Sequence, residues 1–160
     1  MNEHFTEALH ELEQYGISQH DAYLIDFIPL IEMIWADGIK QKAEVDILYQ
    51  FAHEHIERIN KLAGCEVLSM SHTYQFIDRF LSERPDPKLL KTLRNLITKI
   101  RLNSSNKKIN EAVKESILAT CLSIGASATR EYPYGLTERF EASERNCFFE
   151  ILNNLEQNQN

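Results

Sequence analysis

The 160-residue chain has little glycine, little proline and only three cysteines, and each shortage excludes a class of protein. The five glycines form neither a G-x-G-x-x-G nor a G-x-x-x-x-G-K-[ST] segment, so no phosphate-binding loop is encoded. Cys65, Cys121 and Cys147 are widely spaced and lie in apolar stretches, which predicts buried, reduced thiols rather than disulfides. A G-x-S-x-G segment and a cysteine in an activating polar context are also missing. We therefore expect a protein that is not an enzyme.

Long apolar runs are absent as well. No segment approaches the roughly 20 apolar residues that a membrane-spanning helix needs. The first residues, MNEHFTEALHELEQ, are acidic and amphipathic, unlike a signal peptide. The net charge of −7 argues against nucleic-acid binding. These features predict a cytoplasmic protein that does not itself enter the membrane.

Apolar residues recur at helical spacing along the chain, and no segment shows the alternation of a strand. Ser71 and Asp86 are expected N-caps, and Pro29 should kink or split the helix that contains it. The uncharged segment 116–129 predicts a buried, central helix. We expect a single all-α domain over residues 1–160, with helices at about 6–15, 18–35, 42–63, 71–81, 87–100, 107–129 and 137–155.

The helical spacing of apolar residues is interrupted at one place by a segment with an acid at each end. It starts at Asp37-Gly38 and ends at Glu44. A similar succession follows later, where residues 126–128 interrupt an apolar helix and Glu144 lies in the next helix. This internal echo predicts two related helical halves packed around a pseudo-twofold axis.

At these residues the chain resembles the tellurite-resistance TerB-like family, in which an apolar helix ends in Ala-Asp-Gly and an acid follows seven residues after the Asp. The matching residues are Ala36, Asp37, Gly38 and Glu44, and the late glutamate of the family maps onto Glu144. The resemblance covers about residues 22–155. It implies an orthogonal bundle of six or seven helices in two pseudo-repeated halves, a cytoplasmic or membrane-adjacent accessory role in stress or tellurite resistance, and metal association through acidic positions.

The acidic residues around this break suggest a divalent cation site for Ca²⁺ or Mg²⁺, because hard cations bind converging carboxylate oxygens. An EF-hand is excluded, because Met33 and Trp35 occupy two of its ligand positions. The alternative interpretation is structural: Gly38 ends one helix and the glutamate that follows meets the positive N-terminus of the next. The candidate metal ligands are Asp37, Glu44, Glu144 and Glu32.

Two further polar patterns occur in the chain. The run His53-Glu54-His55-Ile56-Glu57 lacks the second histidine of an H-E-x-x-H site and predicts a solvated helix face. Residues 88–110 contain seven Lys or Arg and no acid. The face carrying Lys88, Lys91 and Lys99 either docks an acidic or membrane-associated protein partner or is simply solvated.

Overall fold

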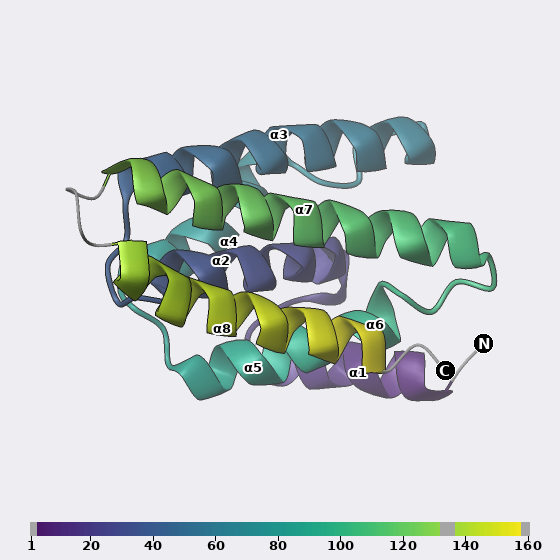
Figure 1. Ribbon diagram of the computed structural model, residues 1–160. Coiled ribbons are helices and arrows are strands. Elements are labelled where there is room, and N and C mark those ends of the chain that lie inside the picture. The colour runs from purple at the N-terminus through teal and green to yellow at the C-terminus, as the bar shows by residue number, and fades with distance from the viewer. Residues whose placement is uncertain (1–2, 132–136, 158–160) are drawn as a thin grey trace.

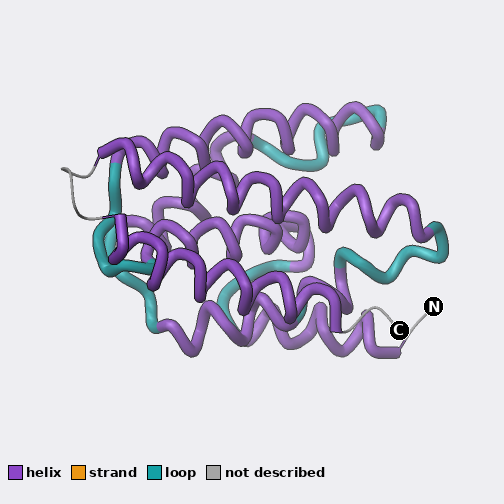
Figure 2. Tube along the Cα trace, in the orientation of Figure 1, coloured by secondary structure: helices purple, strands orange, loops and turns teal. Residues whose placement is uncertain are grey.

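In the computed structural model the described residues are 3–131 and 137–157, with side chains described for 3–127 and 142–156. Every regular element in this part of the chain is helical, which confirms the all-α prediction (Figures 1 and 2). Seven of the described α-helices have eight residues or more. The elements are α1 (Glu3–Gln14), the 3₁₀ helix η1 (Gln19–Phe27), α2 (Ile28–Trp35), α3 (Lys42–Ala63), α4 (Met70–Leu81), α5 (Pro87–Asn95), α6 (Ile97–Ile100), α7 (Lys107–Glu131) and α8 (Thr137–Gln157).

The expected second helix is split, as the proline predicted. Pro29 occupies the first turn of α2, where its missing N–H is not needed, and the residues before it form η1 instead of a continuous α-helix. The short helix α2 is apolar over nearly its whole circumference, with six of its eight residues buried. It therefore lies inside the bundle.

The helix ends follow the local signals with two exceptions. Asp86 accepts a hydrogen bond from the N–H of Lys88, and Gly64 ends α3 in the left-handed conformation. Ser69, not Ser71, caps α4, because its hydroxyl accepts from the N–H of His72 at 3.0 Å. The helix expected over 87–100 breaks at residue 96 into α5 and α6.

The central position expected for segment 116–129 is only partly correct. Helix α7 packs against α2, α3 and α8, and it buries Ile117, Cys121 and Ile124. On its outer side Leu122 is 56% exposed, and Ala119 and Ser123 are exposed too. Lack of charge made this helix look buried on all sides, but the small residues on the outer side lie at the surface. The enclosed helix is α2.

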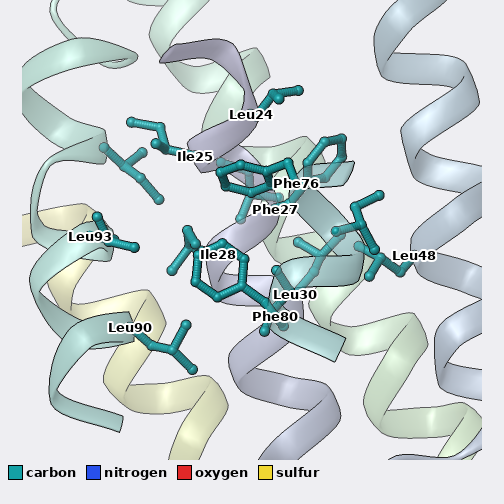
Figure 3. Packing of buried hydrophobic residues seen from close by; sticks show 14 of the residues in the cluster. Leu24, Ile25, Phe27, Ile28, Leu30, Leu48, Phe76, Phe80, Leu90 and Leu93 are labelled. Carbon is teal, nitrogen blue, oxygen red and sulfur yellow. The ribbon is translucent and has the colours of Figure 1, made fainter. Parts of the chain in front are cut away.

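The core gathers around η1 and α2 (Figure 3). Phe27 makes edge-on contacts with Phe51 of α3 at a centroid distance of 5.5 Å, and it also lies against Phe76 of α4. Leu90 and Leu93 of α5 close the core from another side (Figure 3). One cluster of buried side chains thus joins elements from α1 to α8.

The long helices α3, α7 and α8 run alongside one another in Figure 1, and α7 contacts both α3 and α8. The chain reverses between α2 and α3 at the end of the bundle where α7 finishes and α8 starts (left in Figure 1). No described helix is long and apolar enough to cross a bilayer.

Candidate functional site

The break after α2 forms a tight, anchored turn. Gly38 has a φ of +84°, a conformation that L side chains rarely adopt, and Asp37 Oδ1 accepts a hydrogen bond from the N–H of Ile39 at 3.0 Å. Trp35 Nε1–H donates to the carbonyl of Phe80, and Lys40 Nζ donates to that of Leu81. The turn is therefore fixed to the end of α4, and Asp37 stabilises it by accepting from a loop amide.

Glu44 and Glu144 are both buried, at 0% and 1% exposure. Glu44 is the third residue of α3, and its Oε1 accepts from the N–H of Gln41, the N-cap, at 3.1 Å. This contact belongs to the capping box at the start of α3, the position that the structural interpretation gives to Glu44. Glu144 differs, because both its carboxylate oxygens are buried and neither has a hydrogen-bond partner among the described side chains and backbone groups.

Burial raises the pKa of Glu144 to about 8, and the nearby negative charge of Asp37 contributes to the rise. The Asp37 side chain is half-buried. We call the end of the bundle where α2 and α3 adjoin the start of α8 the acidic junction (Asp37, Glu44 and Glu144). It holds a buried carboxyl group that no donor in the described part of the chain satisfies. Buried polar groups without partners are uncommon and require an explanation.

Glu32 has a different role from the one proposed for it. Its Oε2 accepts from Arg94 Nη1 at 2.8 Å, and Arg94 Nη2 reaches Glu150 at 3.0 Å. Arg94 is 1% exposed, and burial raises the pKa of Glu32 to about 7, opposed by the Arg94 charge. Glu32 therefore belongs to an ion-pair network that ties α2 to α5 and α8.

The four carboxylates predicted as metal ligands are not gathered at one point. Among the described residues, no three His, Cys, Asp or Glu side chains lie close enough to hold a metal ion. Of the four, Asp37 and Glu144 interact electrostatically, because the charge of Asp37 helps to raise the pKa of Glu144. A cation site at the acidic junction stays a prediction.

The basic segment 88–110 does not form one face. Lys88, Lys91 and Lys99 are exposed, as expected, but two of its arginines turn inward: Arg94 to Glu32, and Arg101 to Asp26. A pocket of about 420 Å³ lies between α2, α5 and α8 and is lined by Glu32, Trp35, Ala36, Arg84, Pro85, Pro87, Lys88, Leu90, Lys91, Ser143, Asn146, Cys147 and Glu150.

A second buried network of charged side chains was not predicted from the sequence. Arg101 Nε lies 3.1 Å from both carboxylate oxygens of Asp26, and His55 Nε2 lies 3.7 Å from Asp26 Oδ2. His55 is 1% exposed and lies on the buried side of α3, whereas the other polar residues of the His-Glu run are exposed. A signal was present, because Asp26 is a lone acid inside the apolar run YLIDFIPLI, and a buried charge requires a partner.

The cysteines divide into two kinds. Cys121 is buried and Cys147 half-buried, and burial raises the pKa of both thiols. Cys65 is exposed, just after the end of α3, which corrects the expectation that all three are buried. Cys121 is therefore an unreactive core thiol, whereas Cys147 lies at the wall of the pocket of about 420 Å³.

Comparison of the chain with protein-family models, with curated proteins and with solved structures gives no significant match in any of the three. The proposed function is therefore based on the residues of this chain.

Proposed function

We propose that the protein is a non-enzymatic, TerB-like accessory protein that binds a divalent cation at the acidic junction, with Asp37 and Glu144 as ligands and Glu44 beside them. The main support is Glu144, whose two carboxylate oxygens are buried and have no hydrogen-bond partner within the residues that the structure describes. A stress-related role, tellurite resistance included, follows from the family resemblance at Ala36-Asp37-Gly38 and Glu44.

Electrostatics favour a cation at this position. Without one, Glu144 avoids the cost of a buried negative charge by keeping its proton, which is the meaning of its raised pKa. A cation between Glu144 and Asp37 would remove that cost and the repulsion between the two carboxylates. It would displace the proton from Glu144, so binding should strengthen as the pH rises toward 8.

Two carboxylates are enough for one of the candidate ions. Mg²⁺ keeps several of its waters and is commonly held by one or two carboxylates, whereas Ca²⁺ needs six to eight oxygens. The half-buried Asp37 provides the side from which a hydrated ion approaches. The absence of a third converging ligand in the described residues therefore favours Mg²⁺ over Ca²⁺.

The test is thermal unfolding of metal-stripped protein at pH 8, alone and with millimolar Mg²⁺, Ca²⁺, Mn²⁺ or Zn²⁺. An ion at about 100 times its dissociation constant adds roughly 2.7 kcal/mol, or about 5–10 °C for a chain of this size. The Asp37→Asn/Glu144→Gln variant should lose this response. The Asp46→Asn variant removes an exposed carboxylate on α3 and should keep it. If no ion shifts the wild-type midpoint, the junction is purely structural.

The pocket of about 420 Å³ favours a second candidate function, the docking of an acidic, protein-borne segment. Trp35 and Leu90 give it an apolar lining, and Lys88 and Lys91 provide positive charge. Lys99, on α6, is exposed and lies outside the pocket lining. Charge reversal of Lys88 and Lys99 should abolish capture of an acidic partner, including a membrane-associated one, and should leave the response to cations unchanged.

A further inference from the structure

A pocket of about 550 Å³ lies between the C-terminal half of α3 and the N-terminal half of α7, remote from the acidic junction. We propose that this pocket binds a small amphiphilic anion, an apolar chain that carries a single carboxylate, such as a medium-chain fatty acid. It is lined by Tyr23, Asp26, Phe51, His55, Arg58, Ile59, Leu62, Ala63, Val67, Arg101, Ile109, Ala112, Val113, Ser116 and Ile117.

The rim gathers apolar side chains that the fold leaves in water. Leu62 is 81% exposed, Ile109 is 52% exposed and Val67 is 42% exposed. They come from three separate segments, the end of α3, the start of α7 and the α3–α4 connection, and all three line the same pocket. Single exposed apolar residues are ordinary, but a group of them around a concavity marks a binding surface.

The floor of the pocket is charged and internally ordered. Arg101 holds both oxygens of Asp26, and its guanidinium lies 4.5 Å from the centre of the Tyr23 ring. His55 Nε2 is 3.1 Å from the carbonyl oxygen of Tyr23. Asp26 is thereby occupied, and it is the one acid among the lining residues, all of which the structure describes.

Arg58 leaves the pocket with excess positive charge. Its Nη2 donates to His55 Nδ1 at 3.2 Å, which requires that nitrogen to be unprotonated, and burial lowers the pKa of His55 in agreement with a neutral ring. The lining therefore contains two guanidinium groups, a neutral imidazole and a single carboxylate. This hydrogen bond uses one of the five N–H donors of Arg58. Because Arg58 is exposed, its remaining donors can bind a carboxylate that arrives from solvent.

The size of the pocket favours a small molecule over a partner helix. A volume of about 550 Å³ lies in the range of small-ligand sites. An α-helix about 10 Å wide fills roughly 420 Å³ with each turn of 5.4 Å. A docked helix would thus place only one turn inside, whereas an alkyl chain can lie along the apolar side with its carboxylate at Arg58.

Isothermal titration with decanoate, decanol and decyltrimethylammonium tests the proposal, because the three probes share a chain length and differ in charge. Decanoate should bind with a stoichiometry of one, and at least tenfold more tightly than the cation. Arg58→Gln should weaken decanoate about ten- to hundredfold, the range for one hydrogen bond to a charged group. The control Lys61→Gln removes an exposed positive charge one turn along α3, outside the lining, and should change little.

A second variant separates loss of the pocket from loss of the charge. Ala112→Trp places a large side chain at an exposed position of the lining and should block all three probes without affecting the core. The proposal is overturned if decanoate binds no better than decyltrimethylammonium, or if Ala112→Trp leaves its binding intact. It is also overturned if the protein dimerises through this rim, seen as a concentration-dependent mass that Leu62→Ser abolishes. Titrations in EDTA keep these outcomes independent of the cation site.

Discussion

Replacing Glu144 by glutamine should stabilise the metal-free protein above neutral pH. The carboxyl makes no hydrogen bond to any described residue, so the isosteric amide removes a buried charge without removing a described contact. The pKa of Glu144 is about 8, against an ordinary 4.5. Between these values the carboxyl keeps its proton in the folded protein and loses it in the unfolded chain, so stability falls as the pH rises through this window.

The size of the effect follows from the same values. At about 1.36 kcal/mol for each pH unit, the rise in pKa sets an upper limit of about 5 kcal/mol above pH 8. Water near the half-buried Asp37 screens part of this electrostatic cost. The expected gain in the free energy of unfolding of the variant is therefore about 2–3 kcal/mol, or about 5–10 °C in the unfolding midpoint.

Urea unfolding in EDTA at pH 5 and pH 9 measures this difference in unfolding free energy between the variant and the wild type. The Glu144→Gln variant should match wild type at pH 5 and exceed it at pH 9. Glu156→Gln, at an exposed position of the same helix, is the matched control and should behave as wild type at both values. A Glu144→Gln variant no more stable than wild type at pH 9 would refute the argument that an unsatisfied, buried carboxyl occupies the junction.

Three further outcomes follow from the structure. Arg94→Ala should cost about 3–5 kcal/mol in urea unfolding, because it leaves Glu32 buried without its cation, and adding Glu32→Leu to this variant should recover part of the loss. Gly38→Ala should cost about 1–2 kcal/mol, since the φ of +84° is strained for alanine, and an unchanged midpoint would show that the turn relaxes. An aromatic disulfide reagent should label Cys65 quickly in the folded protein and the other two thiols only in denaturant, whereas fast labelling of Cys121 would contradict its burial.

Much of the fold was readable from local sequence. The spacing of apolar residues located α3 at Lys42–Ala63, and Asp86-Pro87 marked the start of α5. Pro29 predicted the division between η1 and α2. These features are local because a cap, a proline or an amphipathic period acts within a few residues.

The candidate site was readable only in part. The acids at Asp37, Glu44 and Glu144 were identified from the break in periodicity, but the different roles of the two glutamates were not. Glu44 accepts from the backbone of its own helix N-terminus, a contact three residues away in sequence. The state of Glu144 depends instead on burial at the end of the bundle and on Asp37, more than 100 residues earlier in the chain.

Sequence by itself determined that the chain is helical, where most helices begin and end, and which acids interrupt the apolar pattern. Tertiary structure alone decided which charges are buried together. Arg94 and Arg101 belong to the acid-free basic segment 88–110, yet each turns inward to a carboxylate more than 60 residues away. Helical periodicity fixes the direction of a side chain relative to its own axis, but the packing of helices decides whether that direction meets water or a buried charge.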